Sequence, residues 1–121
     1  MDVSRIADEK YIYLMTRGRK TGNPHTVELW FAIAGEKIYF SHEGGYTDWM
    51  KNIFEDGRVE FKIGKTQFKG NARIAEAEDE EIFELGKHAL YLKYYGKADE
   101  DAINEWFSES TITEISMIGM V

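Results

Sequence analysis

The amino-acid sequence predicts an α+β fold, a small barrel of six mainly antiparallel strands with short helices. Three observations lead to this class. Segments in which apolar and polar residues alternate recur along the chain. Helical segments follow the third strand and precede the last one. The 121 residues suffice for a single core. Because a closed or half-open barrel leaves few free strand edges, we expect residues 1–121 to form one barrel-like domain.

The first three strands are expected to form an antiparallel meander. Tyr11–Thr16 is aromatic and apolar, as in a short buried strand. After a glycine-containing loop, residues 25–33 alternate between apolar and polar side chains. A turn then leads to Lys37–Ser41, the predicted antiparallel partner. The alternation places one set of side chains inward, namely Val27, Leu29, Phe31 and Ile33, and leaves Thr26, Glu28 and Trp30 on the other face.

A short helix is predicted after the third strand. Gly44 and Gly45 interrupt that strand, and Thr47 suits the N-cap of a helix. Trp49 and Ile53 form an apolar i,i+4 pair on one face of this helix. The segment ends at the Asp-Gly pair of residues 56–57.

The second half of the chain repeats the change from strands to helices. Residues 58–64 alternate, and residues 66–77 form a longer strand in which Gly70 suggests a bulge. A helix is expected from Asp79 to Gly96, followed by a shorter one within residues 98–110. Residues 111–118 alternate imperfectly and complete the predicted barrel.

Composition excludes several functions. The chain has 22 acidic and 15 basic residues, and a net charge of -7 disfavours a nucleic-acid partner. It has no cysteine, so disulfides, thiolate metal sites and a cysteine nucleophile are absent, and its three histidines lack metal-site spacing. No apolar run approaches the roughly 20 residues of a membrane span, and the N-terminus lacks the apolar core of a signal peptide. We expect a soluble, cytoplasmic protein without a metal.

One loop is basic although the chain as a whole is acidic. Arg17, Arg19 and Lys20 lie within four positions, interleaved with Gly18 and Gly22. Such a loop is either a solvated hairpin tip or a place where cations and backbone N–H groups converge on one small phosphate. The residues alone leave both interpretations open.

The motifs around this loop resemble a known family. "TRGRKTGNPHTVELWF" is similar to the opening hairpin of the flavin and deazaflavin oxidoreductases of the split β-barrel superfamily, which includes nitroreductases, quinone reductases and pyridoxamine phosphate oxidases. Their typical form is T-x-G-R-K-[ST]-G-x-P-R-x-x-P-L-[WY]. Residues 38–64 resemble the next block, a strand, a Gly-Gly loop, W-x-x-N-[LI] and a further strand, and residues 106–115 resemble the last helix and strand.

The resemblance implies a homodimeric split β-barrel that binds FMN at the subunit interface, or alternatively the 8-hydroxy-5-deazaflavin coenzyme. Its function would be hydride transfer from the reduced flavin to a small electron-poor acceptor, a quinone or a nitroaromatic. The cofactor carries this chemistry, so no catalytic side chain is assigned. By position, the cofactor-binding residues would be Arg19, Lys20, Thr21, His25, Trp30, His42, Gly44, Gly45, Lys51 and Asn52.

Three departures from the family pattern bear on the cofactor. His25 replaces a frequent arginine, Glu28 occupies the usual proline position, and the loop after the third strand is short, with Glu43 before its glycines. A carboxylate there disfavours the polyglutamate tail of the deazaflavin, and the short loop with Lys51 is typical of the FMN-binding branch. The sequence therefore favours FMN, with a deazaflavin reductase or a non-catalytic flavin-binding module as alternatives.

Overall fold

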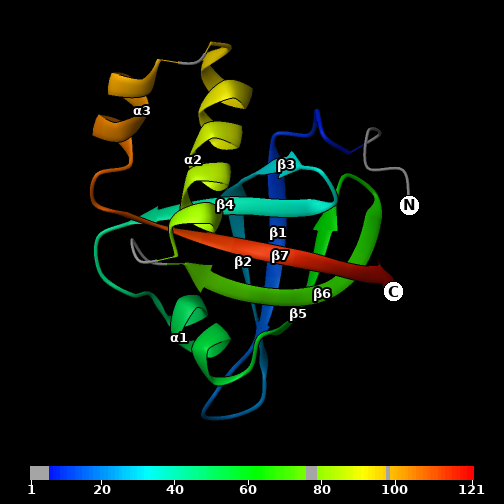
Figure 1. Cartoon of the computed structure of the whole chain (residues 1–121). Helices are drawn as coiled ribbons and strands as arrows, with labels where there is room; N and C mark the ends of the chain where they lie inside the picture. The colour runs from blue at the N-terminus through cyan, green and yellow to red at the C-terminus, as the bar shows by residue number, and fades with distance from the viewer. Residues whose placement is uncertain (1–5, 76–78, 98) are drawn as a thin grey trace.

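The computed structural model of the chain describes residues 6–75, 79–97 and 99–121, and confirms the α+β class (Figure 1). All strands belong to one antiparallel sheet in the order β2-β1-β5-β6-β7-β4-β3, which curls into a half-barrel. The strands are β1 (Tyr11–Arg17), β2 (Pro24–Trp30), β3 (Ala32–Ala34), β4 (Lys37–Glu43), β5 (Arg58–Ile63), β6 (Thr66–Ala75) and β7 (Ser110–Met120). The helices are α1 (Asp48–Glu55), α2 (Glu80–Tyr95) and α3 (Glu100–Trp106). The predicted strand end at residues 76–77 and helix start at residue 98 lie outside the described residues.

The described chain has seven strands rather than six because the second predicted strand is divided at Phe31. β2 pairs with β1, whereas β3 pairs with β4. At the corner between them, the Phe31 N–H donates to the Tyr94 hydroxyl at 2.9 Å, and that hydroxyl lies equally close to the Phe31 carbonyl. The Phe31 N–H is thus satisfied by a side chain of α2 in place of a sheet ladder.

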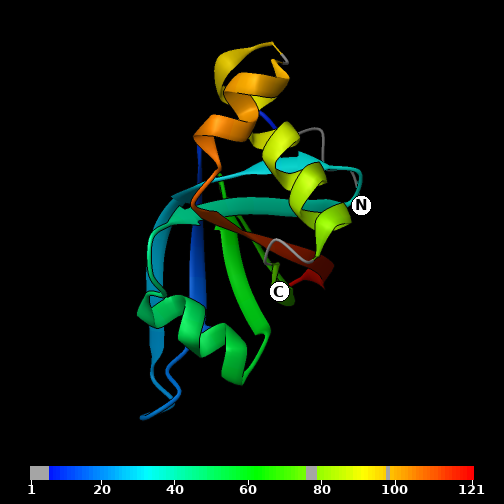
Figure 2. The same cartoon turned by 60° about the vertical axis from the view of Figure 1, so that its left-hand side comes forward.

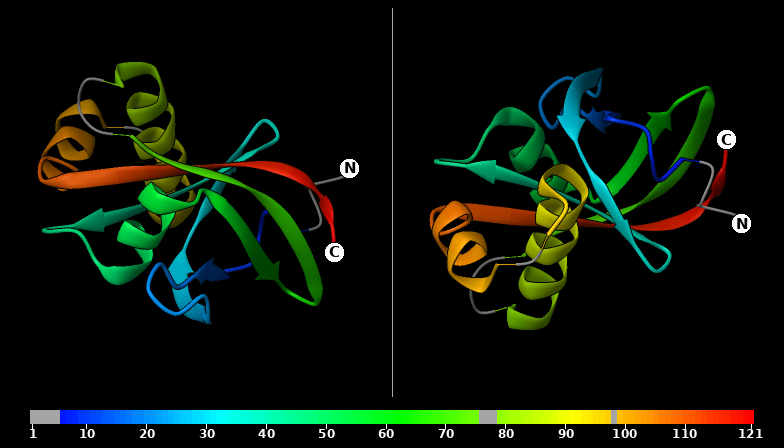
Figure 3. Two further views of the ribbon diagram at one scale, coloured as in Figure 1. Left: turned by 90° about the horizontal axis from the view of Figure 1, so that it is seen from below. Right: turned by 90° about the horizontal axis from the view of Figure 1, so that it is seen from above.

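The core lies on the concave side of the curled sheet. β1, β5 and β4 supply fully buried side chains such as Ile12, Phe61 and Phe40, and α1 adds Met50. A second buried cluster joins α2 and α3 to β4 and β7, and comprises Ala32, Tyr39, Leu90, Ile103, Phe107 and Ile112. Figure 2 shows α2 and α3 together at one end of the molecule, away from α1 and the β1–β2 hairpin, and Figure 3 shows both helices beside the start of β7.

The imperfect alternation of the last strand has a structural cause. β7 lies between β6 and β4, and α2 packs against it. Four consecutive residues, Ile112 to Ile115, are buried, including the carboxylate of Glu114, which accepts a hydrogen bond from the Tyr39 hydroxyl at 2.8 Å. A strand covered on both faces does not show a period of two.

Two glycines allow close approaches within this sheet and helix packing. The predicted bulge at Gly70 is confirmed by a register shift between Lys69 and Gly70, where a Cβ would lie 2.5 Å from the Ser116 carbonyl oxygen. A Cβ at Gly86 would collide with the side chain of Ile112. The absence of a side chain at Gly86 therefore sets how closely α2 approaches β7.

Candidate cofactor and acceptor site

The β1–β2 hairpin presents its cations from a defined turn. The Gly18 N–H donates to the Asn23 carbonyl and the Gly22 N–H to the Gly18 carbonyl, both at 2.8 Å. Gly22 has a φ of 78°, in the left-handed region that glycine tolerates best. A Cβ at Gly18 would lie 2.8 Å from the Asn23 oxygen. These glycines allow the chain to place Arg19 and Lys20 at the tip.

Helix α1 holds the hairpin through Asn52, a residue only 1% exposed. The Asn52 Oδ1 accepts from the Arg19 backbone N–H at 3.2 Å and from its guanidinium at 2.9 Å. The Asn52 amide donates to the Thr16 hydroxyl at 3.1 Å. Arg19 also forms an ion pair with Asp48 at 3.3 Å. Asn52 therefore orients the hairpin, and its polar atoms are already engaged in doing so.

Lys20 differs from Arg19 in its surroundings. It is exposed, and no described residue forms an ion pair or hydrogen bond with it. Lys51, on α1, is likewise exposed, and no described residue forms an ion pair or hydrogen bond with it. Both ammonium groups are available to an anionic ligand, whereas the Arg19 guanidinium would share its donors between ligand and protein.

The N-terminus of α1 contains a buried polar atom without a partner. Thr47 occupies the predicted N-cap, but its side chain makes no cap hydrogen bond. Its Oγ1 is buried and has no hydrogen-bond partner among the described residues. Gly44, just before it, has a φ of 90° and donates its N–H to the Glu109 carbonyl. An orphaned hydroxyl at a helix N-terminus fits a hydrogen-bonding anion.

A hollow of about 570 Å³ lies on the other side of the hairpin. Its lining residues are Arg17, Gly18, Arg19, Gly22, Glu55, Asp56 and Arg58. Arg58 pairs with Asp56 at 2.8 Å, and this hydrogen-bonded guanidinium lowers the pKa of the Asp56 carboxyl to about 2. Three guanidinium groups thus border a space large enough for the phosphorylated tail of a cofactor.

A second group of candidate residues lies where β2 and β4 approach α2. Trp30 stacks on Tyr94 with ring centroids 4.4 Å apart and planes 17° apart. The recess beside this pair is lined by Trp30, Ser41, Leu90, Tyr91, Tyr94, Tyr95, Trp106 and Phe107. Its volume of about 70 Å³ is far below the roughly 300–1,000 Å³ of typical ligand pockets. As it stands, the recess accommodates only the edge of a ring.

The tyrosines of this recess have different roles. The Tyr94 hydroxyl hydrogen-bonds to the Phe31 backbone and donates to the Lys10 carbonyl, so it ties α2 to the ends of β1 and β2. Tyr91 stacks on Tyr95 at 4.7 Å, but neither hydroxyl has a described hydrogen-bond partner. Tyr94 therefore has a packing role, whereas Tyr91 and Tyr95 offer hydroxyls without a described hydrogen-bond partner.

Lys93, which lines the hollow between α2 and β3, is a residue that sequence patterns did not single out. Its Nζ lies 3.5 Å from the centroid of the Phe31 ring and donates to the Glu9 carbonyl at 2.6 Å. Burial lowers the pKa of Lys93 to about 8. The only local signal was a lysine next to a tyrosine in an amphipathic helix, which is too common to predict a site.

The structure brings the ten predicted residues together only in part. Arg19 contacts Asn52, and Lys20 and Thr21 extend from the same turn. His25 lies opposite Thr16 in the ladder, with its ring close to Gly18. Trp30 lies in the aromatic recess together with Ser41. His42, the next residue of β4, packs edge-on against Trp49 with ring centroids 6.2 Å apart.

A larger hollow, about 800 Å³ between α2 and β3, contains none of the ten predicted residues. It is mostly apolar and lies beside a different face of α2 from the aromatic recess.

Two further findings limit the chemistry. Within the described residues, no group of three histidine, aspartate or glutamate side chains could hold a metal ion. The helices in the same part of the chain are too short or too polar to cross a membrane.

Comparison with known proteins identifies the fold. A Bacteroides thetaiotaomicron protein assigned to 5-nitroimidazole antibiotic resistance superposes with a TM-score of 0.76 at 12% identity, over 98% of this chain and 81% of its own. A Listeria innocua protein assigned as a pyridoxamine 5'-phosphate oxidase gives 0.69 at 14% identity, over 98% and 92%. A structure described as F420 reductase gives 0.60 at 17% identity, over 97% and 94%. No curated protein matches the chain in sequence.

The curled antiparallel sheet with its three described helices places the chain in the same split β-barrel fold class as these structures. Residues 2–100 match the family described as F420H(2)-dependent quinone reductase. The chain belongs to this family. The predicted resemblance, fold class and enzyme class are thereby confirmed, and the match supports the deazaflavin alternative better than the FMN preference.

Proposed function

We propose that the chain binds the reduced 8-hydroxy-5-deazaflavin coenzyme F420 and serves as a quinone reductase. The hairpin–α1 junction is the observation that carries this proposal, because Asn52 fixes Arg19 there while Lys20 remains unpaired. The family match over residues 2–100 supports F420 in place of FMN. The preference for FMN rested on Glu43 and a short loop, and Glu43 is exposed, with its charge open to solvent.

The residues present fit the phosphate and tail of such a coenzyme. Lys20 and Arg19 would bind phosphate oxygens, and the orphaned Thr47 hydroxyl would donate another hydrogen bond at the α1 N-terminus. The hollow bordered by Arg17 and Arg58 would accept further anionic groups of the tail. Lys51, on α1, would add a charge from the side of the helix.

The aromatic recess would receive the edge of the acceptor. The coenzyme, when bound, supplies the hydride. The chain's own part is to stack planar rings on Trp30, to exclude water with Trp106, and to hydrogen-bond quinone oxygens with the hydroxyls of Tyr91 and Tyr95. A nitroaromatic is the second candidate acceptor, since a planar ring with an electron-poor oxygen-bearing group uses the same contacts.

Separate titrations with F420 and FMN test this proposal. We expect saturable binding of F420, and oxidation of added F420H2 when a simple quinone is present. Saturable binding of FMN without binding of F420 would overturn the choice of coenzyme. Binding of F420 without turnover of any quinone or nitroaromatic would favour a binding module over an enzyme.

A homodimer is the second part of the proposal. The outer face of β1 and β2 exposes Tyr13 and Trp30, which are 40% and 46% exposed, and would be covered by a second copy. Light scattering is expected to give twice the mass of one 14.0 kDa chain. A monomer that still binds the coenzyme would place the whole site within one chain. Location in the cytoplasm remains a prediction from the sequence.

A further inference from the structure

Helix α3 supplies part of the wall of the aromatic recess, and polar contacts attach it to α2. Trp106, at the end of α3, is 56% exposed and packs edge-on against Tyr95 at 5.2 Å. Phe107 follows it and lines the same recess. The position of α3 relative to α2 therefore sets the shape of this recess.

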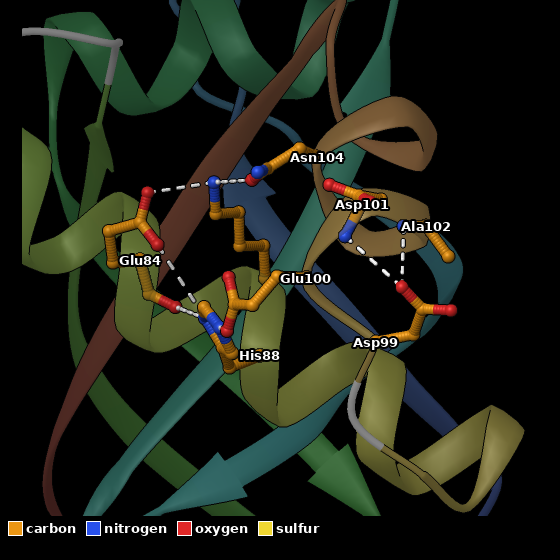
Figure 4. A network of polar contacts seen from close by, with 8 residues as sticks. Glu84, His88, Asp99, Glu100, Asp101, Ala102 and Asn104 are labelled. Atoms are coloured by element: carbon orange, nitrogen blue, oxygen red, sulfur yellow. Dashed lines mark hydrogen bonds and ion pairs between the residues drawn. The ribbon is translucent and has the colours of Figure 1, made fainter.

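A buried lysine makes one of the polar contacts between the two helices. Lys87 of α2 is 6% exposed, and its Nζ donates to Asn104 Oδ1 of α3 at 2.8 Å and pairs with Glu84 at 2.7 Å (Figure 4). This contact links the middle of α2 to α3.

The other contact is a histidine whose two ring nitrogens both face oxygen acceptors. His88 Nδ1 lies 2.8 Å from the Glu84 carbonyl oxygen, and Nε2 lies 2.6 Å from Glu100 Oε1 on α3. A carbonyl and a carboxylate oxygen can only accept, whereas a neutral imidazole carries a single N–H. Only the protonated ring can donate to both, so this geometry is complete in the imidazolium form.

The charges around His88 favour that form. Glu84 from α2 lies 3.6 Å from Nδ1, and Glu100 faces the ring from α3. Lys87, the preceding residue, is paired with the same Glu84. Glu81 and Lys93 line the same outer groove on α2, and the neighbouring β3 residues are apolar. Asp99, also drawn in Figure 4, accepts from the Asp101 and Ala102 N–H groups and caps α3.

The pKa of His88 is raised above its ordinary value of 6.5, chiefly by the hydrogen bond to Glu100 and then by the Glu84 carbonyl. A group whose pKa is raised by folding stabilises the folded contact below its unfolded pKa, and this stabilisation is lost as pH rises through the folded pKa. The contact therefore weakens as the pH rises through the folded pKa of His88, which lies above 6.5.

We propose that protonated His88 is a positioning residue that fixes α3, and with it Trp106, so that binding of the acceptor weakens when His88 loses its proton. The assignment of the recess to the acceptor rests on the proposed function. The proposal that His88 fixes α3 does not rest on the proposed function, because it depends only on contacts within the free protein.

NMR of the free protein tests the positioning without any cofactor. The NMR signal of the His88 ring is assigned by its absence from the spectrum of His88→Gln. Its change with pH is then followed together with the signals of the α3 amides and the Trp106 indole. We expect the His88 ring to titrate with a midpoint above pH 6.5 and the α3 signals to change with the same midpoint. In Glu100→Gln this midpoint should move to a lower pH. α3 signals that do not follow His88, or an unchanged midpoint in Glu100→Gln, would overturn the proposal.

Steady-state kinetics then links the contact to the acceptor. In His88→Gln, KM for the quinone should rise roughly two- to fivefold at pH 6, as expected for loss of a partly exposed ion pair, while coenzyme affinity stays unchanged. His88→Arg, which keeps a charge at all these pH values, should retain the low KM up to pH 9. Equal pH profiles in the wild type and both variants would overturn the link. A failure of coenzyme binding would instead refute the proposed function and leave the NMR result intact.

Discussion

Replacement of both Arg19 and Lys20 by alanine is expected to weaken coenzyme binding by roughly two to four orders of magnitude. Each charge-assisted hydrogen bond to a phosphate contributes about 1.5–3 kcal/mol, and about 1.4 kcal/mol corresponds to a factor of ten in Kd. Fluorescence titration of F420 against the purified variant measures the change directly.

The single variants distinguish direct binding from support of the hairpin. Lys20 has no described partner, so Lys20→Ala removes only a charge. Arg19 also contacts Asn52 and Asp48, so Arg19→Ala should lower stability as well. Lys65→Ala in the β5–β6 turn is the matched control, since it removes an exposed lysine from another hairpin. If Kd is the same in the double variant and in this control, the loop is a solvated turn.

Asn52→Leu is expected to lower the free energy of unfolding by about 2–4 kcal/mol, although leucine has a similar size. The change leaves the Thr16 hydroxyl and the Arg19 backbone N–H without their partner, and each buried unsatisfied group costs about 1–3 kcal/mol. Urea unfolding followed by circular dichroism measures this loss.

The same variant should also weaken coenzyme binding, because Arg19 loses the acceptor that orients its guanidinium. Asn71→Ala, at an exposed position of β6, serves as the control and should change neither quantity. Loss of stability with full coenzyme affinity would show that the hairpin does not depend on α1 for its binding conformation.

The sequence predicted most elements because its local apolar patterns coincide with the buried residues. The alternation of residues 58–64 located β5, apolar segments next to turns located β1 and β4, and the apolar i,i+4 pairs located α1. The division of the second strand at Phe31 was not predictable, because its partner Tyr94 is 63 residues away in sequence. Long-range contacts of this kind leave no local periodicity.

Prediction of the candidate site was also limited by contacts between residues far apart in the sequence. Local spacing predicted a basic hairpin, and the resemblance predicted its partner helix, but neither revealed that Asn52 connects the two. The stack of Trp30 on Tyr94 and the link between His88 and Glu100 also depend on tertiary packing. The preference for FMN rested on the exposed carboxylate of Glu43 and on the short loop with Lys51, and the family match supports the deazaflavin better.

The last strand of the chain is a central strand of the sheet, and this has a consequence for synthesis. β7 pairs with β6 on one side and with β4 on the other, although β4 is made some seventy residues earlier. Until residues 110–120 leave the ribosome, β4 and β6 each keep an unpaired edge that invites wrong partners. The nascent chain can therefore complete this sheet only after residues 110–120 have been made, when β7 closes both edges at once.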